Sequence, residues 1–112
     1  MTLKDFLLIL LNACLLVTGQ IFWKTGIQES GLNWVKLLLD VRVWAGFLAF
    51  ALATLIWFQV LAKVPLSRAL PVQSVAYVLG VLAGCLFFHE SVSWERWLGV
   101  AFIIGGICLV AR

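Results

Sequence analysis

The stretch FLLILLNACLLVTGQIFW, residues 6–23, decides the fold of this chain because it holds no charged residue between Asp5 and Lys24. A helix needs about 20 mostly apolar residues to cross the hydrocarbon core of a bilayer. The run is continuous, whereas a barrel strand would alternate. We therefore predict a membrane-spanning helix over residues 3 to about 23. It is too long for a signal peptide, and no small-residue cleavage pattern follows Gly19, so we expect it to be retained.

Three further apolar stretches predict spanning helices over residues 43–62, about 69–88 and about 94–111. The chain is 64% hydrophobic and only 12% charged, whereas soluble domains are about a quarter charged. Aromatic residues stand near the ends of these stretches, as in an interfacial belt: Phe22, Trp23, Trp34, Trp44, Trp94 and Trp97. We predict an all-α membrane protein in which residues 1–112 form one four-helix domain.

The connections between the predicted helices are short. Residues 24–33, KTGIQESGLN, read as a turn-rich loop, and residues 34–41, WVKLLLDV, as a short interfacial helix. The third helix contains Pro71. If the helix begins at Pro65, this proline removes an interior hydrogen bond and kinks the helix, whereas a start near Leu70 would make it harmless. We favour the kink.

Positive charge sets the orientation of membrane proteins, and here it is balanced between the two sides. One side holds Lys4, Lys63, Arg68 and Arg112, and the other holds Lys24, Lys36, Arg42 and Arg96. Four against four favours no orientation strongly. Insertion in both orientations, a partner that fixes the topology, and control by the N-terminus alone all remain open.

Neutral polar residues replace charge inside the predicted spans, where no titratable Asp, Glu, Lys, Arg or His lies deep. A proton-coupled exporter usually needs such a group in its pathway, so proton/drug antiport is disfavoured. We assign a substrate groove to Asn12, Gln20, Trp57, Gln73 and Tyr77. The alternative is that the amides only join neighbouring helices by hydrogen bonds.

Charged residues at the predicted interfaces provide candidate headgroup contacts. Lys24, Lys63 and Arg68 are candidates for phosphate binding, although most interfacial cations only anchor a protein to anionic lipid. Glu90 is an interfacial acid. No cysteine, histidine or carboxylate spacing indicates a metal or cofactor site, and the net charge of +3 does not indicate nucleic-acid binding.

Small residues indicate close helix packing, within the bundle or in a dimer. Gly80 and Gly84 form a G-x-x-x-G pattern, and Gly105, next to Gly106, is paired with Ala101. Four short helices do not enclose a path for a large substrate. A transporter of this length is therefore expected to be a homodimer or a heterodimer with a similar small subunit.

The segments TGQIFWK (residues 18–24), AKVPLSRALPVQSVAYVL (62–79) and FFHESVSWERWLGVAFIIGGI (87–107) resemble the drug/metabolite transporter superfamily. The chain is similar along its whole length to its four-helix members, which include EamA-like and small multidrug resistance proteins. The closing GVAFIIGGI looks most like the small subunits of the aminoarabinose–phosphoundecaprenol flippase.

The resemblance implies a pair of four-helix protomers in the bacterial inner membrane that move an amphipathic substrate. Small multidrug resistance proteins carry a membrane-embedded Glu in the first helix. This chain has Leu15, Leu16 and Val17 in that region, which argues against cation/proton exchange of that kind. Lys24 and Glu90 stand where the superfamily often has a Lys and a Glu.

We therefore expect a flippase subunit for a polyprenyl-phosphate-linked sugar, such as undecaprenyl-phosphate aminoarabinose. The lipid tail of this substrate would stay in the bilayer. One alternative is efflux of a small amine, drug or metabolite, and another is a non-transporting partner in a larger membrane complex. An enzyme is not expected, because the sequence shows no nucleophile–base pair, metal spacing or phosphate loop.

Overall fold

The computed structural model describes residues 2–112, and their regular secondary structure is entirely helical. The helices are α1 (Leu3–Ser30), α2 (Trp34–Leu39), α3 (Val41–Leu61), α4 (Leu66–Gln73), α5 (Val75–Phe87) and α6 (Trp94–Ala111). Four segments are long and apolar enough to cross a membrane: α1, α3, α4 together with α5, and α6. The predicted all-α membrane fold with four spanning helices is confirmed.

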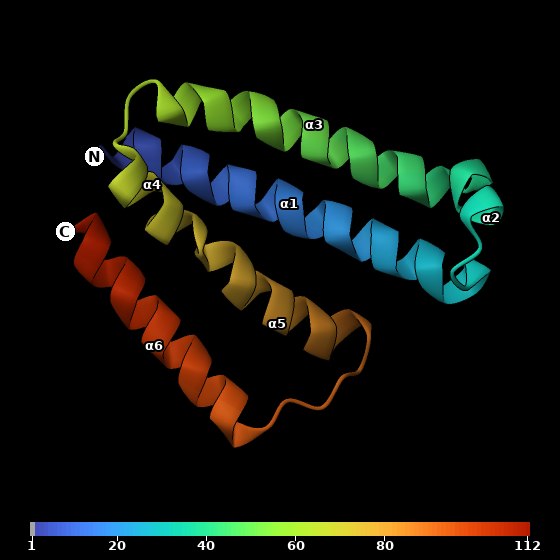
Figure 1. Ribbon diagram of the computed structural model, residues 1–112. Coiled ribbons are helices and arrows are strands. Elements are labelled where there is room, and N and C mark those ends of the chain that lie inside the picture. The colour runs from blue at the N-terminus through green and yellow to red at the C-terminus, as the bar shows by residue number, and fades with distance from the viewer. Residues whose placement is uncertain (1) are drawn as a thin grey trace.

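The spanning segments lie side by side in a single layer, in the order α3, α1, α4/α5 and α6 (Figure 1). The molecule measures 45 × 36 × 17 Å along its principal axes, so it is much thinner than it is wide. Both termini and the α3–α4 connection lie at one end of the layer (Figure 1). We call this the terminal end and the opposite end, which holds α2 and the α5–α6 connection, the distal end.

Helix α1 is longer than the sequence predicts, because it continues to Ser30 instead of ending near Trp23. The predicted loop over residues 24–33 is therefore wrong for most of its length. Gly26 is buried against Asp40 and Val43, so it serves a helix contact and not a turn. The helix stops at Gly31, whose φ of 61° suits glycine.

The predicted interfacial helix at residues 34–41 is found as α2. The Asn33 side chain accepts hydrogen bonds from the Val35 and Lys36 amides and so caps its first turn. Asp40 then separates α2 from α3. The Arg42 guanidinium and backbone amide donate to the Asp40 carboxylate, which lowers the pKa of that carboxyl below its ordinary value. An ionised Asp40 at the start of α3 complements the helix dipole.

Helices α1 and α3 make the most extensive contact between described helices, and their backbones approach each other at two glycines. A Cβ built on Gly19 would lie 3.0 Å from the Gly46 carbonyl oxygen, and one built on Gly46 would lie 3.0 Å from the Gly19 carbonyl oxygen. The Trp23 indole covers Gly46, donates to the Val43 carbonyl at 3.0 Å and stacks on Phe50 with ring centroids 4.5 Å apart. Backbone contact at small residues is a usual way for helices to pack in lipid, where burial of apolar groups gives no advantage.

Pro71 lies inside α4, which begins at Leu66, so it stands in the helix interior, as the kink prediction requires. Proline has no N–H to donate to the Ser67 carbonyl, and its ring disfavours a regular turn before it. The helical hydrogen bonding is interrupted at Ser74, where α4 gives way to α5. The chain therefore crosses the layer as two short helices with a bend between them (Figure 1).

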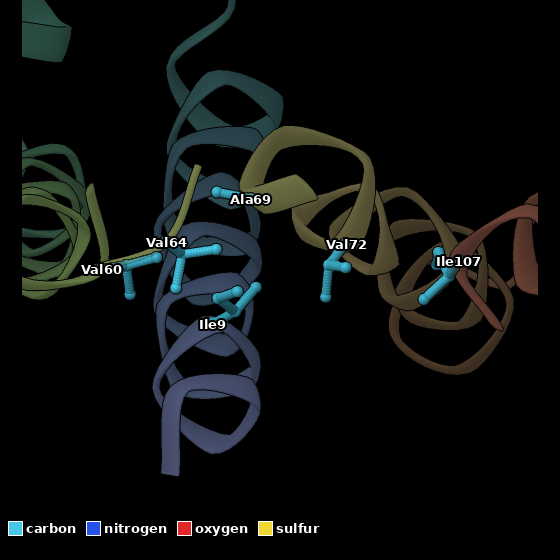
Figure 2. Packing of buried hydrophobic residues seen from close by; sticks show 6 residues of the cluster. All are labelled: Ile9, Val60, Val64, Ala69, Val72 and Ile107. Carbon is cyan, nitrogen blue, oxygen red and sulfur yellow. The ribbon is translucent and has the colours of Figure 1, made fainter. Parts of the chain in front are cut away.

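A small apolar core closes the terminal end of the layer (Figure 2). Its buried members come from α1, α3, the α3–α4 connection, α4 and α6: Ile9, Val60, Val64, Ala69, Val72 and Ile107. Many other large apolar side chains are exposed, for example Phe102 and Leu109 on α6. This outward apolar surface suits a protein whose solvent is lipid.

Replacing Gly46 by Leu should destabilise the protein by about 1–3 kcal/mol or more, because the new side chain must displace Trp23 and separate α1 from α3. The matched control is Gly99→Leu on α6, where a Cβ would meet nothing within 4 Å. Unfolding of both variants in detergent, followed by circular dichroism, gives the comparison. Equal midpoints would contradict the glycine contact.

Candidate functional site

A groove of about 590 Å³ lies between α1 and α5. Its walls are mostly apolar, with polar groups concentrated toward the distal end. The lining residues are Leu16, Val17, Gln20, Ile21, Lys24, Phe50, Ala76, Tyr77, Gly80, Val81, Ala83, Gly84, Phe88, Glu90, Val92 and Arg96. This volume is in the usual range for small-molecule sites.

The groove brings together six of the residues predicted from the sequence: Gln20, Lys24, Tyr77, Gly80, Gly84 and Glu90. Helix α1 supplies Gln20, and α5 supplies Tyr77, whose side chain is exposed. An amide and a phenol can each both donate and accept hydrogen bonds, so the two side chains can bind polar groups without a buried charge.

Opposite charges meet where the groove reaches the distal end. Lys24 Nζ lies 2.8 Å from Glu90 Oε2, with each side chain 47% exposed, and 5.2 Å from the centroid of the Phe88 ring. Arg96 at the start of α6 lines the same groove. Within residues 2–112 its guanidinium has no ion-pair partner. The groove lining therefore contains two cations and one carboxylate.

The turn after α5 places Glu90 in the groove. His89 has a φ of 53°, in the left-handed region, and this reverses the chain so that the Glu90 amide donates to the Gly84 carbonyl at 3.0 Å. The Glu90 carboxylate then lies against Gly84, where a Cβ would collide with it. Gly84 thus makes room for a charged side chain, whereas the sequence predicted a helix-packing role for it.

Asn12 and Gln73 lie together, outside the groove lining. Asn12 is 1% exposed, donates to the Ala53 carbonyl at 2.7 Å and accepts from Gln73 Nε2 at 2.8 Å. This network joins α1, α3 and α4, as the helix-joining alternative expects. Trp57 packs against the apolar core of the terminal end and also lies outside the groove lining.

The remaining predicted residues lie elsewhere in the fold. Lys63 and Arg68 flank the α3–α4 connection at the terminal end, whereas Lys24 lies toward the distal end (Figure 1). Gly105 and Gly106 face open space on α6, with nothing within 4 Å of a built Cβ. The groove residue Gly80 is equally open, so these glycines have room for a second chain.

Sequence reasoning missed Arg96 and the Gly19–Gly46 contact. From the sequence, Arg96 is counted only among the charges that set orientation, although it follows soon after Glu90 in the chain. The sequence does contain a periodic signal for the Gly19–Gly46 contact. The buried residues of α1 include Asp5, Asn12, Gly19 and Gly26, and those of α3 include Gly46, Ala53 and Val60, all at seven-residue spacing. Such spacing places small and polar residues on one helix face.

The profile of the EamA-like transporter family matches residues 6–112 of this chain. The chain belongs to the EamA-like transporter family. A relative from Escherichia fergusonii, 35% identical over 94% of this chain and 95% of its own length, is named as a probable 4-amino-4-deoxy-L-arabinose-phosphoundecaprenol flippase subunit ArnE.

Two further relatives of this EamA-like chain carry the same name. The protein from Aeromonas hydrophila is 36% identical over 95% of this chain and 96% of its own length. The protein from Pseudomonas fluorescens is 32% identical over 93% and 95%, respectively. No solved structure is significantly similar to this chain. Four spanning helices in a bacterial transporter family indicate a multi-pass protein of the inner membrane.

The Asn12–Gln73 hydrogen bond should appear as an energetic coupling between the two positions. Because the bond is largely shielded from water, a double-mutant cycle with Asn12→Ala and Gln73→Ala should give a coupling energy of about 0.5–1.5 kcal/mol. Unfolding in detergent measures each corner of the cycle. Strictly additive losses would show that the bond does not hold α4 to α1.

Substitutions at His89 should follow the tolerance of each residue for positive φ. His89→Gly and His89→Asn should keep stability, whereas His89→Val should cost about 1–2 kcal/mol, since a β-branched residue is strained in the left-handed region. Thermal unfolding of the three variants tests this order. A Val variant as stable as the Asn variant would contradict the observed turn.

Proposed function

We propose that this chain is a subunit of a flippase that moves a polyprenyl-phosphate-linked sugar, such as undecaprenyl-phosphate aminoarabinose, across the bacterial inner membrane. The names of its full-length relatives support this substrate class. Among the structural features, the observation that carries the proposal is a mostly apolar groove that ends in charged side chains. The role is transport, with no chemical conversion of the substrate.

The groove suits an amphipathic substrate in which only the headgroup is polar. It lies between α1 and α5 in a single-layer molecule, so a polyprenyl tail can remain in the surrounding lipid. Gln20 and Tyr77 offer hydrogen bonds to the sugar hydroxyls partway along the groove. A neutral polar path lowers the cost of moving hydroxyls through the hydrocarbon region, where each unsatisfied group is expensive.

Cations stand at both ends of the layer and provide two stations for the substrate phosphate. Lys63 and Arg68 lie at the terminal end, and Lys24 lies at the distal end. Lysine and arginine both bind phosphate, and arginine does so through two parallel hydrogen bonds. In this proposal the phosphate exchanges one set of cations for the other during translocation.

A second small subunit completes the translocation path in this proposal. One layer of helices gives the groove a wall on α1 and α5, while the opposite wall must come from lipid or from another chain. The relatives are themselves named as subunits. The open glycines Gly80, Gly105 and Gly106 provide surfaces on which a second copy or a similar small subunit can pack closely.

Efflux of a small amine is the second candidate function. Glu90 favours it, because a carboxylate at the groove mouth can bind a cationic substrate. The family also fits a metabolite exporter. Resistance to a toxic cation on overexpression would support this candidate over the flippase.

Reconstituted protein should flip a polyprenyl-phosphate sugar in liposomes, with headgroup exposure read by an impermeant oxidant. The double variant Lys63→Ala/Arg68→Ala should slow flipping at least about tenfold, because the phosphate loses its cations at the terminal end. Lys4→Ala/Arg112→Ala removes two other positive charges from the same side and is the matched control. Equal rates in both double variants would contradict the phosphate role. No flipping with the chain alone or with a copurifying subunit would contradict the flippase.

A further inference from the structure

Both signs of charge are built into the distal mouth of the groove. The Lys24 ammonium and the Glu90 carboxylate are 2.8 Å apart, and Arg96 adds a second cation on the same lining. A site for a simple anion needs only the cations, and a site for a simple amine needs only the carboxylate. A mouth that carries both suits a ligand that carries both.

The Lys24–Glu90 pair is accessible enough to exchange partners. Each side chain is about half exposed, and half-exposed ion pairs contribute little to stability because water and salt compete with them. A ligand that offers a phosphate to the cations and an ammonium to the carboxylate replaces one internal pair with two new ones. Opening the pair therefore costs little and leaves no charge without a partner.

The position of Glu90 is defined by the backbone. The left-handed turn at His89, the hydrogen bond from the Glu90 amide to Gly84 and the missing side chain at Gly84 together direct the carboxylate into the groove. Glu95, a few residues later on the first turn of α6, is not part of the lining. The groove thus includes one of two nearby carboxylates.

We propose that Lys24, Arg96 and Glu90 form a subsite for a zwitterionic lipid headgroup, in which the cations bind the phosphate and Glu90 binds a sugar ammonium. The inference rests on the proposed flippase function and adds to it a determinant of specificity. Glu90 selects an amino sugar over a neutral sugar on the same lipid carrier. An alkylamine on a sugar is protonated at neutral pH, so the carboxylate discriminates by charge.

Binding to two matched lipids tests the subsite. The full-length chain is placed in phosphatidylglycerol nanodiscs and titrated with a short-chain prenyl phosphate that carries aminoarabinose, and with its N-acetylated analogue, which has no positive charge. Glu90→Gln should raise the Kd of the amino lipid about tenfold and leave that of the acetylated lipid within about twofold. Lys24→Gln should weaken both lipids, and Glu95→Gln and Lys36→Gln are the matched controls.

The outcomes separate this inference from the function on which it rests. Unchanged binding of the acetylated lipid also shows that Glu90→Gln is folded. If the wild type binds the amino lipid and Glu90→Gln binds it equally well, the subsite is wrong while the flippase stands. If the wild type binds neither lipid, the flippase and the subsite are both overturned. If phosphatidylethanolamine at the same mole fraction displaces the amino lipid, the mouth binds any zwitterionic phospholipid and the assignment to an amino sugar is overturned.

Discussion

The backbone contact between Gly19 on α1 and Gly46 on α3 is the constraint on which the rest of the structure depends. It brings the two longest helices together and aligns them along their lengths. Trp23 then covers Gly46 and stacks on Phe50, a residue that also lines the groove. In lipid, such steric fit takes the place of the hydrophobic effect, and it fixes α1 as the central wall against which α5 forms the groove.

Polar contacts inside the layer hold the first half of the third spanning segment. Gln73 bonds to Asn12, which also bonds to the α3 backbone, so α4 is joined to α1, and through α1 to α3, just before the interruption at Ser74. Beyond Ser74, α5 supplies the other wall of the groove. Three amides are predicted to contact substrate. Asn12 and Gln73 instead join helices, whereas Gln20 lines the groove.

The sequence predicts the spans and the kink because hydropathy and proline act locally. It fails where tertiary contact overrides a local rule. Gly26 stays helical because Asp40 and Val43 pack on it. At Gly84, the sequence predicts contact with another helix, but the structure places the Glu90 carboxylate there. Three residues of the candidate site follow from helical spacing: Tyr77, Gly80 and Gly84. The position of Arg96 in the groove lining depends on the course of the α5–α6 connection, which includes His89 in the left-handed region. Sequence periodicity does not reveal that course.

The helix layer carries charged side chains at its two ends and neutral polar ones between them. This arrangement is consistent with the proposed movement of a charged headgroup. A titratable group in the middle of the layer would bind the headgroup strongly where it must pass, and would itself be costly to keep in the hydrocarbon region. Half-exposed charges at the mouth of the groove can bind a charged headgroup and still release it, because water weakens each ion pair. In the proposed transport, Gln20 and Tyr77 need only replace the hydrogen bonds that the substrate makes to water. Under the proposed function, the depth of each side chain in the layer would set how strongly it can hold the substrate.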